Sequence, residues 1–309
     1  MDIVYLRKLE ISIIDKPRLC DYTTFKLGGA CPILFQCETP EQIEAVVKEL
    51  KSEKIDFITI GEGSNLIVSD EGIKQYVIRY LTKKPDIVQA GKDIFVSGST
   101  LLDDLASFCA EDGLKGLNFA SGIPGTVAGA IVGNAGAYGK QIADVLVGMD
   151  ILDEKGNRKY IEKNKLSFSY RESSLKKTNE IVLSAHFLCE PSDKEFLLKE
   201  RENILKERSE KHPDYKKIPC AGSVFKNVMP TSNAGRRQSA GWFLDQAGAK
   251  NFAVGGASVF EKHANIVIKK YDSCKAQDVF DLIQKMSANV QEQFNLSLEP
   301  EVRFVGKFK

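Results

Sequence analysis

Eight glycines fall between positions 113 and 139, where the sequence reads GLKGLNFASGIPGTVAGAIVGNAGAYG. Leu, Phe, Ile and Val are interspersed among them, whereas disordered glycine tracts lack such apolar residues. Each glycine inside a packed helix costs roughly 1 kcal/mol relative to alanine. The segment therefore predicts either a closely packed structural loop or a loop whose backbone lies directly against a large flat or anionic ligand.

The bulk composition is that of a soluble globular protein. The 309 residues predict two or three domains, with 43% hydrophobic and 28% charged residues. A net charge of +1 argues against a protein that coats nucleic acid. No apolar run approaches the ~20 residues of a membrane span, and the N-terminus lacks a signal-peptide core. We therefore expect a cytoplasmic protein with no nucleic-acid partner and no membrane insertion.

Cysteine and histidine usage limits the possible metal and redox chemistry. The seven cysteines are scattered and contain no C-x-x-C pair, which is typical of reduced, mostly buried thiols. Only three histidines are present, so no histidine-based metal site is expected.

Periodicity and capping signals predict a mixed α/β organisation. Thr39-Pro40-Glu41-Gln42 is a capping box that begins a helix reaching about Lys54, within a compact α/β region that ends near residue 81. Ser192 and Glu195 form a second capping box before a charged helix that ends near Lys211. Other expected elements include strands at 94–97, 181–188, 253–260 and 265–269, a hairpin at 147–161, a helix from 101 that stops at Gly113, helices at 240–247 and 276–294, and a closing strand at 297–305.

Two glycine-containing loops are candidates for phosphate binding. Residues 61–65 join a strand to another strand, so they are a poor match to the dinucleotide fingerprint, which opens a helix. This loop is either a simple turn or a set of hydrogen-bond donors for a pyrophosphate. Residues 121–126 offer backbone N–H groups and a hydroxyl beside an apolar run. The two loops together are more specific than either alone.

Three further segments carry polar groups with two open interpretations each. Arg171, in FSYRESS, belongs to a surface ion pair or holds a carboxylate or phosphate. The stretch 222–227 is a loop anchored by a buried Phe225, or it presents Ser, Lys and Asn to a ligand. On a strand, Glu299, Glu301 and Arg303 share one face, either as a structural ion pair or as an acid–cation pair facing a substrate.

Eight stretches of the chain read YTTFKLGG (22–29), GEGSNLIVSDEG (61–72), GLNFASGIPGTVAGA with NAGAYG (116–139), FSYRES (168–173), AGSVFKN (221–227), AGWFLDQAGAK (240–250), VGGASVFEKHAN (254–265) and LEPEVRFVG (298–306). In this order they resemble the motifs of UDP-N-acetylenolpyruvoylglucosamine reductases, a family of flavoenzymes. Single stretches are weakly specific, but eight in register make a chance match implausible. The chain resembles the shorter subtype of this family over nearly its full length.

The resemblance implies an α+β protein with three domains. Two of them form an FAD-binding fold of the vanillyl-alcohol-oxidase or PCMH type, and the third is an α+β substrate-binding domain. The implied boundaries are 1–81 for the first FAD-binding subdomain, 82–205 with 298–309 for the second, and 206–297 for the substrate-binding domain. The last strand would return Glu301 to the flavin.

The reaction that the resemblance implies is NADPH-dependent reduction of UDP-N-acetylglucosamine enolpyruvate to UDP-N-acetylmuramate, in peptidoglycan precursor synthesis. NADPH would reduce FAD, whose N5 would give a hydride to C3 of the enolpyruvyl group while C2 takes a proton. Ser223 matches the family's proton donor. Arg171 matches the arginine at the substrate carboxylate, and Glu301 matches the glutamate there, which could donate a hydrogen bond if protonated.

The resemblance also assigns binding roles to particular residues. For the substrate these are Tyr170 at the pocket border, Asn227 at the uridine nucleotide and Lys211 at the diphosphate. Non-covalent FAD would be held by Gly61, Glu62, Gly63, Ser64, Asn65, Ser121, Gly122, Ile123, Pro124, Gly125, Thr126, Gly129 and Ala130.

Two other functions are compatible with parts of this pattern. One is a flavin oxidase of the same fold with another substrate, although the absence of His from 61–72 and 113–139 argues against a covalently tethered flavin. The other is a nucleotide-binding module without catalysis, which predicts loss of Ser223, Arg171 or Glu301. All three residues are present, which favours the reductase.

Overall fold

The computed structural model describes residues 1–229 and 237–309, so most of the basic stretch 229–239 lies outside the described residues. The chain forms two compact units, each assembled from separate segments. Unit 1 comprises Met1–Lys16, Pro32–Glu62 and Gln75–Glu207, and unit 2 comprises Pro17–Cys31, Gly63–Lys74 and Arg208–Lys309. The mixture of helices and strands in both units confirms the predicted α+β class.

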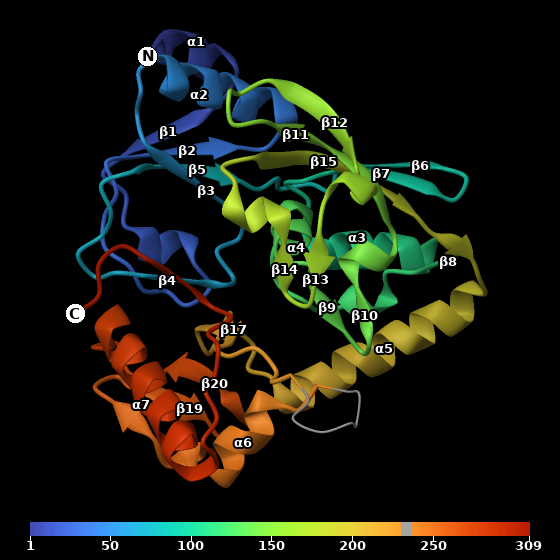
Figure 1. The fold of residues 1–309 in the computed structure, drawn as a ribbon. Coiled ribbons are helices and arrows are strands. Elements are labelled where there is room, and N and C mark those ends of the chain that lie inside the picture. Colours follow the sequence, from blue (N-terminus) through green and yellow to red (C-terminus); the bar gives the residue numbers. More distant parts are fainter. Residues whose placement is uncertain (230–236) are drawn as a thin grey trace. The chain divides into compact units, whose positions relative to one another are not determined.

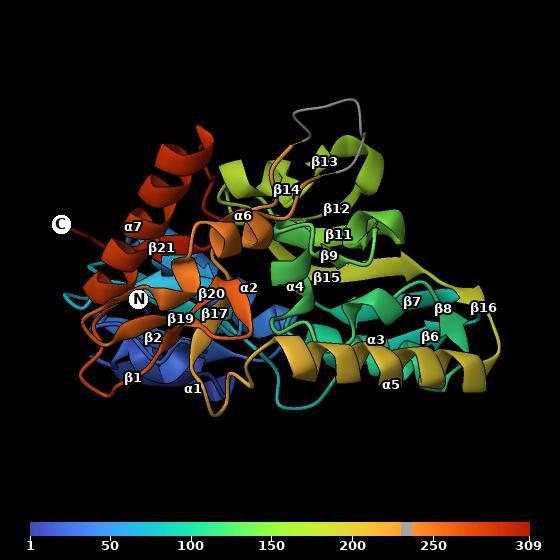
Figure 2. The same cartoon turned by 90° about the horizontal axis from the view of Figure 1, so that it is seen from below.

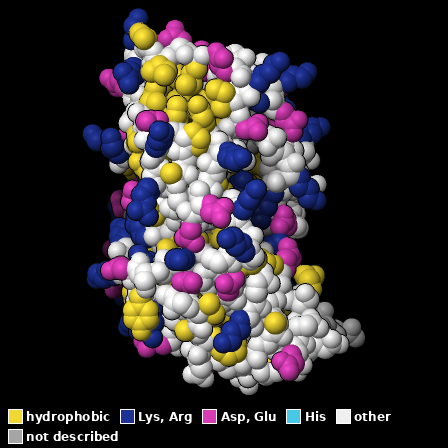
Figure 3. All heavy atoms as spheres, turned by 90° about the vertical axis from the view of Figure 1, so that its left-hand side faces the viewer, with side chains coloured by type: hydrophobic (Ala, Val, Ile, Leu, Met, Phe, Trp, Pro, Cys, Tyr) yellow, Lys and Arg dark blue, Asp and Glu magenta, His cyan; other side chains and the backbone are white. Residues whose placement is uncertain are grey.

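The first sheet of unit 1 has the strand order β1-β2-β5-β3 (Figure 1). These strands are β1 (Ser12–Asp15), β2 (Ile33–Cys37), β3 (Phe57–Ile60) and β5 (Tyr76–Tyr80). β5 pairs in parallel with β2 and β3, whereas β1 pairs antiparallel with β2. Helix α2 (Pro40–Ser52) buries Ile43, Val46, Val47 and Leu50 against this sheet. Hydrophobic side chains gather at the upper end of Figure 3, where Figure 1 draws α1 and α2.

The capping box predicted for α2 is confirmed. The Thr39 hydroxyl accepts a hydrogen bond from Gln42 N, and Gln42 Oε1 accepts one from Thr39 N, each at 3.3 Å. Pro40 occupies the start of the helix, where its missing N–H would have had no intrahelical partner.

The second sheet of unit 1 is antiparallel, with the order β12-β11-β15-β7-β6. Its strands are β6 (Ile87–Ala90), β7 (Asp93–Ser97), β11 (Leu146–Leu152), β12 (Arg158–Glu162) and β15 (Ile181–Leu188). The predicted hairpin at 147–161 is confirmed, and Asp153 Oδ1 closes its turn by accepting from Lys155 N and Asn157 N at 2.9 Å. Helices α3 (Leu102–Glu111) and α4 (Val127–Val132) share the hydrophobic core of this sheet (Figure 1).

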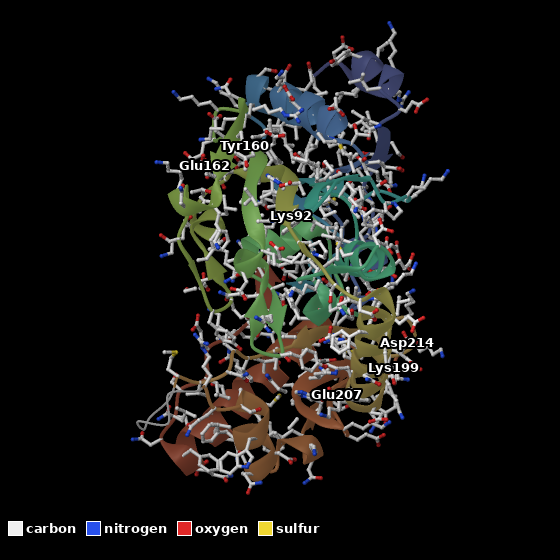
Figure 4. The ribbon with its side chains drawn as sticks, turned by 90° about the vertical axis from the view of Figure 1, so that its right-hand side faces the viewer. Lys92, Tyr160, Glu162, Lys199, Glu207 and Asp214 are labelled. Atoms are coloured by element: carbon white, nitrogen blue, oxygen red, sulfur yellow. The ribbon has the colours of Figure 1, made fainter. Side chains whose placement is uncertain are left out.

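Helix α5 (Lys194–Lys211) runs beside α3 (Figure 2), and Figure 4 shows Lys199 and Glu207 along it. Its cap differs from the prediction. Because the helix begins at Lys194, the capping position is Asp193, whose Oδ1 accepts from Phe196 N at 2.6 Å; the predicted box on Ser192 and Glu195 is wrong. The helix leaves unit 1 after Glu207.

Unit 2 contains a four-stranded antiparallel sheet of order β17-β20-β19-β18. The strands are β17 (Cys220–Ser223), β18 (Ala253–Val254), β19 (Ala257–Phe260) and β20 (His263–Lys269). Helices α6 (Ala240–Gln246) and α7 (Ala276–Phe294) complete its hydrophobic core. As predicted for the long helix, its buried face carries Val279, Leu282, Ile283, Met286 and Val290.

A two-stranded parallel sheet in unit 2 joins β4 (Leu66–Val68) to β21 (Arg303–Val305). The closing strand predicted at 297–305 is therefore too long. Pro300 has no backbone N–H to donate to a ladder, and residues 299–301 instead lie beside residues 224–226.

The remaining elements are short. They are α1 (Ile3–Lys8), the pairs β8 (Leu114–Lys115) with β16 (Glu190–Pro191), β9 (Gly136–Ala137) with β10 (Lys140–Gln141) and β13 (Phe168–Ser169) with β14 (Glu172–Ser173), and 3-10 helices at Leu19–Tyr22, Asn118–Ala120, Ile142–Asp144, Lys163–Lys165, Ser174–Lys177 and Ala249–Asn251. Six of the seven cysteines are buried, as predicted, and Cys20 is half-buried. Within residues 1–229 and 237–309, no helix has the length and apolar character required to cross a membrane.

The start of α7 generates a stability prediction. The Asp70 carboxylate, from the loop after β4, accepts from Ala276 N at 2.9 Å and from Gln277 N at 3.1 Å. Because these N–H groups have no intrahelical acceptor, Asp70→Ala should lower the free energy of unfolding by about 1 kcal/mol in urea titrations. The control is Asp272→Ala, which removes an exposed carboxylate 3.5 Å from Lys269 Nζ and should cost less than about 0.5 kcal/mol. Equal losses would contradict the capping role.

Candidate functional site

The glycine loop 121–126 is bound tightly to the segment before α3. Gly125 O accepts from Leu102 N at 2.9 Å, and Val127 N donates to Thr100 O at 2.9 Å. The Thr126 hydroxyl caps α4 by accepting from Gly129 N at 3.3 Å. Gly122 and Gly125 have φ of +70° and +119°, a backbone conformation that side chains with a Cβ rarely adopt. The loop is therefore an ordered part of unit 1.

Two carboxylates bracket this loop. Gly122 N donates to Asp103 Oδ1 at 2.7 Å, and Gly125 N donates to Glu62 Oε2 at 2.6 Å. Arg201 Nη1 on α5 lies 2.6 Å from the same Asp103 oxygen. These two backbone N–H groups are thus already bonded to the protein's own acidic side chains, which fixes the loop shape from both ends.

The structure brings the start of the 61–65 loop into contact with the glycine loop. A Cβ added to Gly61 would lie 2.5 Å from Thr126 Oγ1, which is closer than real Cβ atoms approach. Gly61 is therefore required for space. Gly61 and Glu62 belong to unit 1, whereas Gly63, Ser64 and Asn65 belong to unit 2.

Ser121 supplies the observation that tests whether a cofactor fits here. Its side chain is fully buried, and its Oγ has no hydrogen-bond partner among the described residues. An unsatisfied buried hydroxyl costs about 1–3 kcal/mol, and a ligand atom that bonds it removes that cost. The loop therefore fits the FAD that the resemblance implies.

Tyr170 and Arg171 form the two-residue turn between β13 and β14. Arg171 has φ of +57°, and its guanidinium carbon lies 5.1 Å from the Tyr170 ring centroid. Such a conformation is uncommon in a residue other than glycine and costs about 1 kcal/mol or more. Ser173 Oγ anchors the hairpin to the last residue of α4 by donating to Val132 O at 2.7 Å. One short helix thus connects the glycine loop to the turn that carries Arg171.

In unit 2, Ser223 ends β17 immediately after a β-bulge. Cys220 pairs with Ile268 and Ser223 with Ile266, so β17 has one extra residue between these pairs. Gly222 has φ of +73°, and a Cβ added to it would contact nothing within 4 Å. Glycine is therefore needed at this position, directly before Ser223, for its backbone conformation.

Ser223 and Glu301 are brought together by their backbones. Glu301 N donates to Val224 O at 2.8 Å, next to Ser223 in the chain. Lys226 N donates to Glu299 O at 2.9 Å, and Lys226 Nζ lies 2.5 Å from Glu299 Oε1. The ion pair of Glu299 therefore involves Lys226, a partner that the alternation of 299–303 did not suggest. Phe225 is 1% exposed, so it is the buried anchor that one of the two interpretations predicted, and its burial is compatible with either.

Two residues support this region in ways that sequence reasoning missed. Asn65 Nδ2 donates to Glu301 O at 3.0 Å, and Asn65 O accepts from Arg303 N at 3.0 Å. Thr24 Oγ1 donates to Cys220 O at 2.8 Å. Both lie in motifs that the resemblance singled out, but a single sequence contains no signal that links them to segments about 200 residues away.

The other predicted substrate residues lie in two places. Asn227 Oδ1 accepts from Ala240 N at 3.1 Å, at the start of α6. Lys211 is the exposed last residue of α5 and precedes His212.

Two histidines next to this region have lowered pKa values. Burial, and then the charge of Arg208, lower the pKa of His212 to about 4. Its ring centroid lies 5.3 Å from that of His263, whose pKa burial also lowers.

Comparisons with known proteins agree over nearly the whole chain. Residues 32–160 match a family model described as FAD binding domain. Residues 212–305 match one described as UDP-N-acetylenolpyruvoylglucosamine reductase, C-terminal domain. These matches support the predicted FAD-binding fold together with a second, reductase-specific region.

Curated proteins named UDP-N-acetylenolpyruvoylglucosamine reductase are similar to this chain. The protein from Caldicellulosiruptor bescii is 37% identical over 99% of this chain and 95% of its own length. The protein from Bacillus subtilis is 32% identical over 97% of both chains. The crystal structure of the reductase from Thermus caldophilus superposes with a TM-score of 0.78 at 29% identity, covering 96% of this chain and 99% of that one.

The contact between the two glycine loops can be tested by paired substitutions. Gly61→Ala should lower the free energy of unfolding by about 1–3 kcal/mol, because its Cβ would overlap Thr126 Oγ1. Gly129→Ala points a Cβ toward the same oxygen at 3.5 Å, an ordinary contact, and should be neutral or stabilising by up to about 1 kcal/mol in the helix. The free energy of unfolding of both variants is measured in urea titrations. An unchanged value for Gly61→Ala would refute the contact.

The half-buried His212 predicts a dependence of stability on pH. Its folded pKa of about 4 lies below the ordinary 6.5, so the unfolded chain takes up the proton first as the pH falls. The free energy of unfolding should decrease from about pH 6.5 and level off below about pH 4. His212→Gln should reduce this decrease. An unchanged profile in His212→Gln urea titrations would contradict the burial of a neutral imidazole.

Proposed function

The chain belongs to the UDP-N-acetylenolpyruvoylglucosamine reductase family, and from that premise we propose that it catalyses the NADPH-dependent reduction of UDP-N-acetylglucosamine enolpyruvate. The product is the lactyl ether of UDP-N-acetylmuramate. The observation that carries the proposal is the bond from Glu301 N to Val224 O at 2.8 Å, which holds the backbones of two motifs side by side. Those motifs carry Ser223 and Glu301, the residues proposed as the acid and the carboxyl of this reaction.

The reaction adds a hydride to C3 and a proton to C2 of the enolpyruvyl group. When bound, FAD supplies the hydride. Ser121 and the loops 61–65 and 121–130 would hold the cofactor, and the buried Ser121 hydroxyl supports this assignment.

After the hydride reaches C3, negative charge develops at C2 and spreads into the substrate carboxylate. Three side chains are proposed to stabilise or neutralise this charge. Arg171 is always charged and can bind the carboxylate through two N–H groups. Protonated Glu301 would donate a hydrogen bond to the same developing enolate. Ser223 Oγ would give its proton to C2, which is feasible because an enolate carbon is strongly basic.

The remaining roles concern substrate binding and cellular context. Tyr170, Asn227 and Lys211 are proposed to bind the sugar nucleotide, with Lys211 at its diphosphate. The three-domain division at 81/82, 205/206 and 297/298 is retained as part of this proposal. The product is a precursor of peptidoglycan, so we place the reaction in the bacterial cytoplasm, where the nucleotide substrate is present.

A two-step experiment without oxygen tests this function. The yellow protein is reduced with one equivalent of NADPH, the enolpyruvyl substrate is added, and absorbance in the flavin band is followed. The reductase predicts rapid reoxidation with formation of UDP-N-acetylmuramate. Reoxidation that requires oxygen and ignores the enolpyruvate would favour a flavin oxidase instead.

Ser223→Ala separates the two steps. Because it removes the proposed proton donor, reduction by NADPH should be retained while reoxidation by the substrate slows by about 10²–10⁴-fold. Ser258→Ala, at a buried serine on β19 of the same sheet, is the matched control and should keep both rates. A Ser223→Ala variant with an unchanged second step would remove Ser223 from the mechanism.

A further inference from the structure

The residues that follow Ser223 leave the regular strand ladder, and one side chain replaces it. Asn265, on β20, is 3% exposed. Its Oδ1 accepts from Phe225 N at 3.0 Å, and its Nδ2 donates to Phe225 O at 2.8 Å. Its backbone O accepts from Val224 N at 2.9 Å. Asn265 thus binds two consecutive residues after Ser223 through three hydrogen bonds.

The side-chain geometry requires an amide. Bonding both the N–H and the C=O of one residue takes one acceptor and one donor on the same planar group. Aspartate keeps the size but has no donor while it is ionised, so Phe225 O would lose its partner. Phe225 is itself buried, and an unsatisfied carbonyl there would be costly.

The same short strip of backbone is bonded on its other side to the segment that carries Glu301. Val224 O accepts from Glu301 N at 2.8 Å, and Lys226 N donates to Glu299 O at 2.9 Å. Residues 224–226 therefore lie between Asn265 and residues 299–301. Ser223 directly precedes this strip and follows Gly222, which has a φ of +73°. Because glycine has no Cβ, its backbone alone restricts the position of Ser223 only weakly.

We infer that Asn265 is a positioning residue that fixes the direction of Ser223 relative to Glu301 by holding Phe225. Because Asn265 is buried and bonded to backbone, it acts through Ser223 and not by contact with substrate. This role rests on the proposed function for its kinetic consequence, but the hydrogen bonds themselves can be tested independently.

The kinetic test uses Asn265→Asp in the flavin-loaded protein. Reduction by NADPH should stay within about twofold of the original rate, whereas reoxidation by the enolpyruvyl substrate should slow by about 10–100-fold, because misplacement by about 1 Å costs that much. The solvent deuterium isotope effect on reoxidation should rise, since proton transfer becomes more rate-limiting. If reoxidation and its isotope effect are unchanged, the positioning role is wrong.

A matched control separates positioning from general destabilisation. Asp278 Oδ2, at the start of α7, accepts from Gly256 N at 2.9 Å and from Lys275 N at 3.0 Å in the same unit. Asp278→Asn should lower stability without changing the isotope effect. If the isotope effect rises in the Asp278 variant as well, loss of stability explains the result and the inference falls.

Amide hydrogen exchange provides the readout that does not depend on activity. Exchange at Phe225 N should accelerate in Asn265→Ala, which removes the Oδ1 acceptor of that N–H, while exchange in α7 keeps its protection; unchanged protection at Phe225 would overturn the inference. If the unmodified protein is not reoxidised by the enolpyruvate, the proposed function fails while this measurement still decides the hydrogen bond. Should Asn265→Asp not fold, Asn265→Ser provides the same comparison.

Discussion

Buried loop backbone must find hydrogen-bond partners, and in this protein side chains from distant segments provide them. Helices and strands satisfy their own N–H and C=O groups, but the loops that carry the candidate site cannot. Glu62 and Asp103 bond the glycine loop, Thr24 bonds the first residue of β17, and Asn265 bonds Phe225. The shape of these loops therefore depends on a few polar side chains, most of which have no proposed contact with substrate or cofactor.

The sequence was informative wherever a local pattern determines the structure. The capping box at Thr39, the hairpin around Asp153 and the apolar face of α7 are set by residues within a few positions of one another, and each was predicted correctly. The predictions failed where two signals in the same short segment favoured different structures. Asp193 displaced Ser192 as the cap of α5, and Pro300 shortened the last strand because it cannot donate to a ladder.

The candidate site was predictable only in part, for the same reason. Composition and spacing identified the loops at 61–65, 121–126 and 222–227, and the resemblance supplied the roles of Ser223, Arg171 and Glu301. The supporting residues could not be derived, because a pair such as Thr24 and Cys220 is joined only after the chain folds. The sequence also does not show why a glycine is needed at a given position. Gly61 is required because a Cβ would not fit, whereas Gly222 is required for its positive φ.

The chain passes between the two units at 16/17, 31/32, 62/63, 74/75 and 207/208. As a consequence, the C-terminal hundred residues are not an exchangeable module, although a family model matches 212–305 as a domain. Cut at residue 208, that segment would lose β4, the strand that pairs with β21, and Asp70, which bonds the first turn of α7. A gene fusion that moved this segment to another protein would have to transfer residues 17–31 and 63–74 with it, so recombination has few sites at which it could separate the two units.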